Sequence, residues 1–278
     1  MDLRLQKVCV KFGEWELKNI SFEVNSSEFF SIVGPTGSGK STILKAIAGI
    51  EGIKSGSVFV SDKKINDVAP EKRNIGFVFQ NASLFSHLNV LENVAFGPKI
   101  RKDKNASEKA KMFLEMVGLN GFEERKVSGL SGGQSRLVSI ARALAIEPKI
   151  LLLDEPLNGL DARLREKLKV LIKKIQRELK VTTVYVTHDI DEAFFLSDKI
   201  MVLNEGKVEQ IGLPSEIFSS PKNSFVREFV SDYALVKANV EKKHNKNFLV
   251  GEFAFETDLN EGKGYINIKK NNFRKKTY

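Results

Sequence analysis

A glycine-rich stretch between two apolar segments constrains this chain more than any other feature. Residues 34–41 read Gly-Pro-Thr-Gly-Ser-Gly-Lys-Ser, with the apolar run 29–33 before them and a helical pattern over 42–49 after them. Glycines allow successive backbone N–H groups to point inward, and the N-terminus of a helix adds partial positive charge. A strand, such a loop and a helix, in that order, bind phosphate groups. The stretch therefore predicts a nucleotide-phosphate site.

Two side chains at the end of this stretch suit the chemistry of a nucleotide. The ammonium group of Lys40 can reach the β- and γ-phosphates, and the Ser41 hydroxyl can ligate Mg²⁺. A glycine-rich turn without chemical function is the alternative interpretation. It is disfavoured because all fixed positions of a phosphate loop are present within an intact strand–loop–helix order.

A pair of adjacent carboxylates follows a second apolar run. Asp154 and Glu155 come directly after residues 150–153, which are typical of a buried strand. Neighbouring carboxylates repel one another unless a cation or proton is present, and beside a phosphate loop Mg²⁺ is the expected cation. Asp154 would hold the metal directly or through water, and Glu155 would orient or deprotonate an attacking water. An acidic surface turn is the alternative.

Two further polar residues stand at the ends of predicted buried strands. Gln80 follows residues 75–79, and His188 follows the β-branched run 181–186 and Thr187. Open α/β sheets place ligand contacts at the carboxyl ends of their parallel strands, so both side chains are candidates for the phosphate site. The alternatives are a plain strand cap for Gln80 and a structural histidine for His188.

The spacing of apolar residues predicts an α/β fold with additions. Residues 3–24 alternate in the manner of an antiparallel sheet, residues 81–147 carry the periodicity of an inserted helical subdomain, and residues 160–179 form a long amphipathic helix. A hairpin over 200–207 and a last helix over 215–231 complete a domain of residues 1–231. We expect residues 232–278 to form a small β-rich appendage.

Two aromatic residues near the N-terminus allow two interpretations. Phe12 and Trp15 lie in the predicted antiparallel sheet, where they could pack in its core. Either could instead provide an aromatic surface for an adenine ring, because every purine offers a π-face. The residues alone leave both interpretations open.

The composition of the chain limits the cellular compartment and the kinds of partner that we expect for it. The 278 residues contain no apolar segment of about 18–20 residues that could span a bilayer, and no signal-peptide pattern at the N-terminus. The single cysteine, Cys9, is typical of a reducing compartment, so we expect a cytosolic protein. The net charge of +9 comes from lysines spread along the chain, which favours a solvated surface over nucleic-acid binding. A basic tail over 269–276 is hydrated or attracted to an anionic membrane surface.

One more motif indicates a family. Leu130-Ser131-Gly132-Gly133-Gln134, together with the phosphate loop, Gln80, Asp154-Glu155 and His188 in that order, resembles the ATPase subunits of ABC systems over residues 1–230. The resemblance implies a P-loop NTPase core with an antiparallel β subdomain and an inserted helical subdomain. It also implies a head-to-tail dimer around two ATP molecules.

The resemblance also implies roles for individual residues. Glu155 would be the catalytic base, Gln80 a contact to Mg²⁺ and water, and His188 a switch for the γ-phosphate. Ser131 and Gly133 would contact the γ-phosphate bound by the partner's loop, and Phe12 would stack on adenine. The implied contacts to ATP are Phe12, Gly34, Pro35, Thr36, Gly37, Ser38, Gly39, Lys40, Ser41, Thr42, Ser131, Gly132, Gly133, Gln134 and Asp161, and those to Mg²⁺ are Ser41, Gln80 and Asp154.

Three segments resemble the importer branch of this family. They are residues 84–93, residues 161–165 and the C-terminal β tail, and they imply a separate membrane permease, an external substrate-binding protein and a second ATPase copy, identical or related. The chain would then lie on the cytoplasmic side of the membrane and bind no nucleic acid. Two features resemble the molybdate/tungstate branch. They are the short spacing from Phe12 to Leu17 and the sequence Glu28-Phe29-Phe30. Sugar, polyamine or iron import, and export or lipid transport, are the alternatives.

The chain departs from the usual family pattern in three places. Ser135, Arg136 and Leu137 follow Gln134, which places the arginine one position early, and Asn158 stands where serine is common. We expect both changes to lie at the dimer interface and to alter coupling. Ser86 replaces a common proline in the segment that meets the membrane partner.

Overall fold

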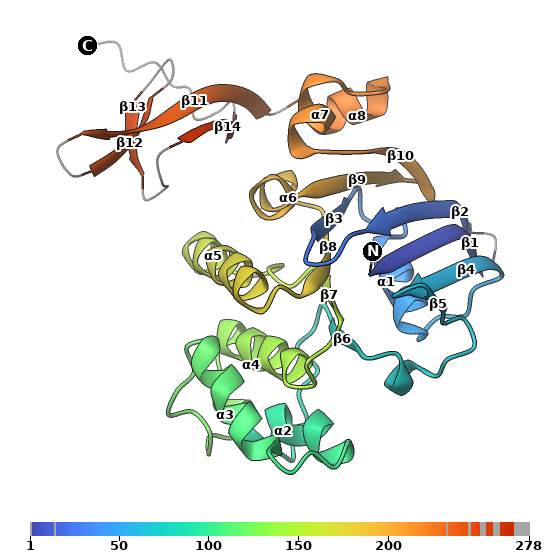
Figure 1. Ribbon diagram of the computed structural model, residues 1–278, viewed down its shortest axis with the longest axis vertical. Helices are drawn as coiled ribbons and strands as arrows, with labels where there is room; N and C mark the ends of the chain where they lie inside the picture. Colours follow the sequence, from blue (N-terminus) through green and yellow to red (C-terminus); the bar gives the residue numbers. More distant parts are fainter. Residues whose placement is uncertain are drawn as a thin grey trace. The chain divides into compact units, whose positions relative to one another are not determined.

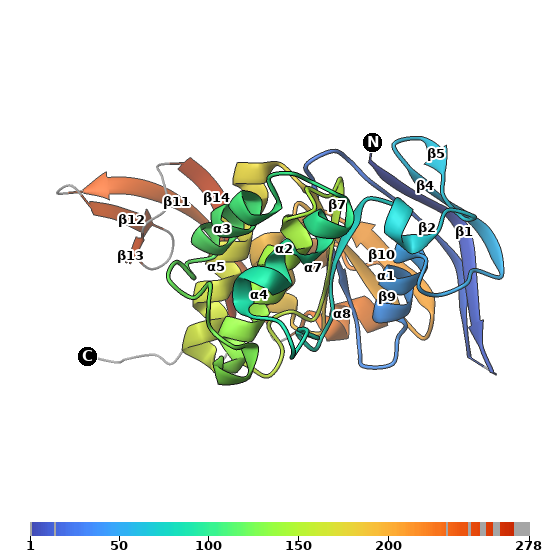
Figure 2. The same cartoon turned by 90° about the horizontal axis from the view of Figure 1, so that it is seen from below.

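The computed structural model describes residues 2–13, 15–231, 233–243, 246–250, 254–257 and 262–269, with side chains for 2–11, 13 and 15–231. The chain forms two compact units, Met1–Val208 and Glu209–Tyr278, and each is described by itself (Figure 1). Within the first unit, the helices α2, α3 and α4 gather together, away from the strands β1, β2, β4 and β5 (Figures 1 and 2). The sheet that positions the candidate site is also in this unit.

The first sheet is antiparallel, as predicted for residues 3–24. It comprises β1 (Leu3–Phe12), β2 (Trp15–Val24), β4 (Ser55–Val60) and β5 (Lys63–Lys64), in the order β2-β1-β4-β5. Ile20, Phe22 and Val24 of β2 alternate with exposed polar residues, so one face packs on the core and the other faces solvent. Lys7 and Asn19 have positive φ angles, where the pairing of β1 with β2 shifts register.

The central sheet holds five parallel strands, and the three innermost of them are fully buried. Its order is β10-β9-β3-β8-β7-β6, and β3 pairs in parallel with β8 and β9, as β7 does with β6 and β8. All residues of β3, β7 and β8 are buried, which explains the mainly apolar sequences of β3 and β7 and the β-branched residues of β8. The bounds are β3 (Phe29–Val33), β6 (Ile75–Val78), β7 (Ile150–Asp154), β8 (Thr182–Thr187), β9 (Lys199–Asn204) and β10 (Lys207–Gly212).

One strand of this sheet differs from its prediction. Residues 75–79 read as a buried strand, but β6 lies at the sheet edge, where Ile75 and Phe77 are only half-buried. Phe79, directly before Gln80, lies outside the strand and is exposed. An edge strand has a neighbour on one side only, so its side chains are covered less completely than those of β7 and β8.

Helices form where the sequence predicts the inserted subdomain. They are α2 (Val90–Ile100), α3 (Ala106–Met116) and α4 (Gly132–Leu144), with short 3₁₀ turns at Pro70–Lys72 and Val127–Gly129. Asn89 and Glu92 form a reciprocal capping box at the start of α2, which satisfies backbone N–H groups that have no partner within the helix. Val94, Phe113 and Val138, one from each helix, are buried in a common apolar cluster.

Three helices each follow a parallel strand along the chain, after β3, β7 and β8. They are α1 (Lys40–Ala48), α5 (Ala162–Leu179) and α6 (Ile190–Leu196). The predicted amphipathic stripe is confirmed in α5, where Leu168, Ile172 and Ile175 are buried and the opposite face carries charged residues. Asp161 precedes this helix and caps it.

The second unit contains short helices and an antiparallel sheet. The strands are β11 (Tyr233–Lys243), β12 (Lys246–Val250), β13 (Ala254–Thr257) and β14 (Gly262–Lys269), in the order β13-β12-β11-β14. These strands agree with a β-rich appendage, and its boundary at residue 231 stays a prediction, because the compact units divide at Val208. The basic tail predicted over 269–276 lies outside the described residues, apart from the backbone of Lys269.

The prediction of one helix over residues 215–231 is wrong. Two helices occupy this stretch, α7 (Pro214–Ser219) and α8 (Ser224–Phe229). Pro221 lies between them, and proline has no N–H group to donate within a helix. Asn223 then accepts a hydrogen bond from the Val226 N–H group and caps the second helix.

A buried arginine closes the end of α1. The Arg73 guanidinium is 8% exposed and donates to the carbonyl oxygens of Ala46, Ile47, Asn66 and Val68. Ala46 and Ile47 belong to the last turn of α1, where backbone carbonyls lack donors from a following turn, although the Ala46 carbonyl also accepts from the Gly49 N–H group. Gly49 makes room for this group, because a Cβ atom there would lie 2.4 Å from Arg73 Cζ. Arg73 therefore joins the helix of the phosphate loop to the chain that leads into β6.

The variant Arg73→Met is expected to lower the free energy of unfolding by about 2–3 kcal/mol, since it leaves buried carbonyl groups without donors. Urea denaturation with an unchanged m-value measures this loss. The matched control is Lys72→Met, because Lys72 is exposed. Equal stability of the two variants would contradict a role for Arg73 in holding α1.

Candidate nucleotide site

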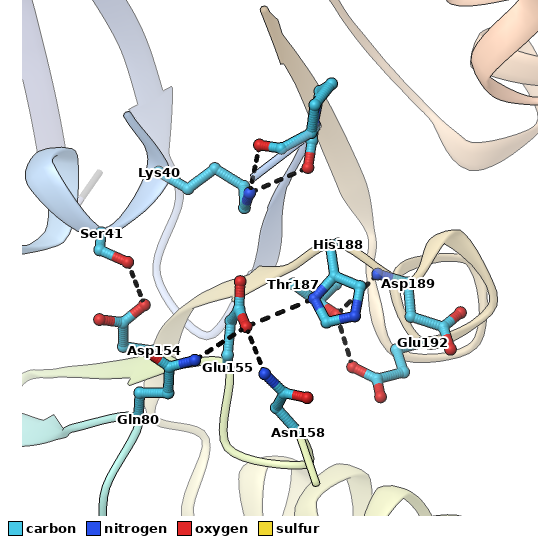
Figure 3. A network of polar contacts seen from close by, with 12 residues as sticks. Lys40, Ser41, Gln80, Asp154, Glu155, Asn158, Thr187, His188, Asp189 and Glu192 are labelled. Carbon is cyan, nitrogen blue, oxygen red and sulfur yellow. Dashed lines mark hydrogen bonds and ion pairs between the residues drawn. The ribbon is translucent and has the colours of Figure 1, made fainter. Parts of the chain in front are cut away.

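The carboxyl ends of the central strands meet at one edge of the sheet. The loop after β3, the end of β7, the end of β8 and the segment after β6 enclose a cavity of about 420 Å³. Because these strands are parallel, their carboxyl ends necessarily face the same edge. The cavity is lined by Trp15, Thr36, Gly37, Gly39, Lys40, Ser41, Thr42, Gln80, Glu155, Asn158 and His188. The candidates from four separate strands therefore come together as predicted (Figure 3).

Two glycines of the loop are required by close packing. A Cβ atom on Gly34 would lie 2.0 Å from the carbonyl oxygen of Leu203, and one on Gly39 would lie 2.6 Å from the Trp15 ring. Gly39 also has a φ of +103°, a conformation that other residues rarely adopt. The loop is therefore held between β9 and the Trp15 side chain, and α1 begins directly after Gly39.

Lys40 places a positive charge beneath this loop. Lys40 is 4% exposed, and its ammonium group donates to the carbonyl oxygens of Gly34 (2.9 Å) and Pro35 (2.8 Å). Burial lowers the pKa of Lys40, and the carboxylates of Glu155 and Asp154 oppose this shift. The Lys40 ammonium group can therefore bind an anion at the N-terminus of α1, where the helix dipole also attracts negative charge.

Ser41 and Asp154 form the second contact of the site. The Ser41 hydroxyl donates to Asp154 Oδ1 at 2.7 Å. Asp154 is buried, and this burial raises its pKa, while the hydrogen bond from Ser41 lowers it and the neighbouring Glu155 raises it again. Two oxygen ligands of the kind that Mg²⁺ prefers therefore lie together beside the loop.

Glu155 is held by residues from three other segments. Its Oε2 atom accepts hydrogen bonds from Gln80 (3.3 Å) and Asn158 (2.9 Å), and it lies 3.3 Å from His188 Nδ1 (Figure 3). The Glu155 φ angle is +43°, and its N–H group bonds to the Val186 carbonyl oxygen. A non-glycine residue in this conformation costs free energy that the surrounding contacts must offset, a feature common at functional sites.

Asn158 is the contact to Glu155 that sequence reasoning missed. The sequence drew attention to it only as a departure from the family pattern. The available signal was its position, three residues beyond Glu155 in the turn that leaves β7, where the Asn158 N–H group bonds to the Glu155 carbonyl oxygen. A side chain that returns across such a turn can reach the residue that begins it.

The structure places one of the two candidate aromatic residues at the cavity. Trp15 lines the cavity and contacts the phosphate loop at Gly39. The side chain of Phe12 lies outside the described residues, so its stacking on adenine stays a prediction. Trp15 therefore provides an aromatic surface at the site, in agreement with the second interpretation of this pair.

The Ser131–Gln134 motif lies apart from the cavity lining. Ser131 caps α4 and accepts from the Gln134 N–H group (3.2 Å), while the Gln134 side chain accepts from the Ser131 N–H group (2.9 Å). Ser131 and Gly132 are exposed, whereas Gly133 packs against Leu164. Neither this motif nor Asp161, which accepts from the Leu164 N–H group, lines the cavity within one chain.

Arg136, which stands one position earlier than the arginine of the usual family pattern, points into the molecule. Arg136 is 8% exposed and donates to the Phe79 carbonyl oxygen (2.9 Å), the residue before Gln80. Arg142, also on α4, donates to the carbonyl oxygens of Ala82 and Ser83. The expectation that this departure lies at a dimer interface is therefore wrong for the Arg136 side chain. It anchors the segment that carries Gln80 to α4.

Comparisons with known proteins identify the family. The ABC transporter family model matches residues 17–158. The spermidine/putrescine import ATP-binding protein PotA of Clostridium acetobutylicum is 48% identical over 231 residues, 82% of this chain and 66% of that protein. The Fe(3+) ions import ATP-binding protein FbpC of Fusobacterium nucleatum is 41% identical over 277 residues, 99% of this chain and 72% of that protein. The chain belongs to the ABC transporter family.

A solved structure supports the fold and the activity of this ABC cassette. The dimeric ATP-binding cassette MJ0796, in a post-hydrolysis state with ADP and phosphate bound, is 37% identical, with a TM-score of 0.69 over 76% of this chain and 98% of that one. The fold expected from the resemblance is confirmed, and the chain is an ABC ATPase. It spans about two thirds of the length of the curated relatives that it matches. No helix in the described part of the chain is long and apolar enough to cross a membrane.

Lys40→Ala is expected to weaken ATP binding by about two orders of magnitude, because truncating one partner of a buried charge pair costs about 2–5 kcal/mol. Titration with a fluorescent ATP analogue measures this loss. Lys63→Ala, at an exposed lysine of β5, is the control and is expected to bind as the wild type does. Unchanged affinity in Lys40→Ala would contradict the assignment of the loop.

Proposed function

We propose that this chain is the ATP-hydrolysing subunit of an ABC importer, working as a dimer that drives a separate membrane permease. The observation that carries the hydrolytic role is the convergence of Gln80, Asn158 and His188 on the Glu155 carboxylate, beside Lys40 and the phosphate loop. The import role is supported by the relatives PotA and FbpC, which are import ATP-binding proteins.

In the proposed mechanism, the loop and Lys40 hold the phosphates of ATP. The inward N–H groups, the N-terminus of α1 and the Lys40 ammonium stabilise negative charge as it develops on the transferred phosphoryl group. Glu155 accepts the proton of the attacking water, and the groups that hold its carboxylate keep it aligned for this step. His188 lies half-exposed beside Glu155, where it would contact the γ-phosphate.

The residues present fit a magnesium ion. No cluster of three His, Cys, Asp or Glu side chains that could hold a metal occurs among the described residues, so the donor set would combine a hydroxyl, a carboxylate and an amide oxygen with phosphate oxygens. Ser41, Asp154 and Gln80 would supply these three. When bound, the ion would neutralise charge on the β- and γ-phosphates.

We assign the completion of the site to a second copy. Gly132 and Gly133 begin α4, and their N–H groups form an anion-binding helix terminus that does not line the cavity of their own chain. In a head-to-tail dimer, Ser131 to Gln134 of one protomer would contact the γ-phosphate in the other, and Asp161 would lie near it. ATP would then hold the dimer together, and hydrolysis would release it.

The proposed partners are a permease and an external substrate-binding protein, with the chain peripheral on the cytoplasmic face of the membrane. Molybdate, tungstate or another small anion stays the predicted substrate. The residues that favoured it have structural roles, because Phe29 and Phe30 are fully buried and Glu28 accepts from the Asn25 N–H group. The named relatives import a polyamine and ferric iron, which differ in chemistry, so the substrate must be read from the binding protein.

Glu155→Gln is expected to retain ATP binding and to lower kcat by about three orders of magnitude, the middle of the range for loss of a general base. Steady-state phosphate release and nucleotide titration measure the two quantities. Glu71→Gln, at an exposed glutamate, is the control. Wild-type turnover in Glu155→Gln would show that another group acts as the base.

Copurification tests the importer role directly. The tagged full-length chain, isolated from detergent-solubilised membranes, is expected to carry a multi-span permease that mass spectrometry identifies. Its binding protein would then be tested by calorimetry with molybdate, tungstate, spermidine and ferric ion. An export permease or a soluble partner in place of the import permease would contradict the proposed function and leave the ATPase chemistry unaffected.

A further inference from the structure

A buried carboxylate lies behind the His188 turn and has no place in the mechanism above. Glu192, on α6, is 5% exposed, and its Oε2 atom accepts hydrogen bonds from the Tyr185 hydroxyl (2.6 Å) and the Thr187 hydroxyl (2.7 Å). Tyr185 and Thr187 belong to β8, and both are buried. Burial raises the pKa of Glu192, and the hydrogen bonds from the two hydroxyl groups lower it.

The same network fixes the turn that carries His188. The Thr187 hydroxyl donates to Glu192 and accepts from the Asp189 N–H group (3.0 Å), so it spans both sides of His188 (Figure 3). Asp189 also lies 3.7 Å from the Arg165 guanidinium of α5. The backbone on either side of His188 is therefore tied to α6, and the position of its ring depends on Glu192.

A small polar cavity connects Glu192 with Glu155. Its volume is about 20 Å³, and about 10–15 Å³ is enough for one water molecule with two to four polar partners. The cavity is lined by Glu155, Leu157, Asn158, Arg165, Thr187, His188, Asp189 and Glu192. The buried Nε atom of Arg165 has no hydrogen-bond partner within the described part of the chain. A donor without a partner and two carboxylates on one such cavity favour a bridging water.

We propose that Glu192 is a positioning residue for ATP hydrolysis, which fixes the Thr187–Asp189 turn and, through one water molecule in this cavity, orients the Glu155 carboxylate. The proposal rests on the proposed function, because the roles of Glu155 and His188 belong to it. Glu192 touches neither nucleotide nor attacking water. Its loss therefore changes the rate of hydrolysis and leaves the affinity for ATP as it is.

Glu192→Gln in the full chain tests this separation. The amide keeps one oxygen for the two hydroxyl groups, but it replaces the second carboxylate oxygen with an NH₂ group that cannot accept from the water. We expect kcat to fall about tenfold, which corresponds to the loss of one hydrogen bond to a charged group, while the affinity for ATP and the melting temperature stay close to wild type. Glu178→Gln, at an exposed glutamate of α5, is the control. Wild-type kcat in Glu192→Gln would overturn the proposal.

A pair of variants at Thr187 separates positioning from folding. Thr187→Ser keeps the hydroxyl that joins Glu192 to the Asp189 N–H group, whereas Thr187→Val keeps the shape and removes the hydroxyl. We expect Thr187→Ser to retain kcat and Thr187→Val to lose it, both with unchanged affinity for ATP. Equal kcat in the two variants would overturn the proposal, because the hydroxyl would then have no part in hydrolysis.

A double-mutant cycle distinguishes failure of this inference from failure of the proposed function. His188→Ala and Glu192→Gln are expected to be non-additive, with a combined loss smaller than the product of the single losses, since both act through the same turn. Full additivity would overturn the positioning role. Wild-type activity in both His188→Ala and Glu155→Gln would instead contradict the proposed function, whatever Glu192→Gln does.

Discussion

The site depends on the position of one carboxylate, that of Glu155. Three side chains on different segments reach its Oε2 atom: Gln80 after β6, Asn158 in the turn after β7 and His188 after β8. None of these segments is adjacent to another in sequence, and only parallel pairing of β6, β7 and β8 brings their ends together. The positive φ of Glu155 is sustained by the same contacts. Local strain and sheet topology thus determine together where the carboxylate lies.

Buried charge gives the region around Glu155 its chemical character. Lys40 and Asp154 are almost fully buried. Burial lowers the pKa of Lys40 and raises the pKa of Asp154, which favours the neutral form of each. Nearby opposite charges and the Ser41 hydroxyl act against these shifts. Such groups are costly to bury without a compensating ligand. An anionic nucleotide with its cation supplies compensation to both at once, which is why a phosphate loop and an acidic strand end occur together in this fold.

The sequence predicted the inner strands, the loop and most residues of the cavity because these depend on local signals. Apolar runs mark β3 and β7, and β-branched residues mark β8. Gly34 and Gly39 stand where the backbone approaches its neighbours too closely for a side chain. Contacts across the fold were not predictable in this way. Asn158, the inward direction of Arg136 and the Tyr185–Glu192–Thr187 network all depend on which elements pack together. Pro221 indicated the break between α7 and α8, but one continuous helix was predicted there.

The central claim is that the ATPase site is shared between two copies, and mixing two inactive variants tests it most directly. Gly132→Asp places a negative charge at the start of α4, where a Cβ atom meets nothing within 4 Å, so the chain folds but repels a phosphate bound by its partner. Lys40→Ala disables the other half of the site. Each variant alone is expected to be inactive, and the mixture is expected to hydrolyse ATP, because one intact site forms in each mixed dimer. A mixture as inactive as its components, or full activity in Gly132→Asp alone, would contradict the shared site.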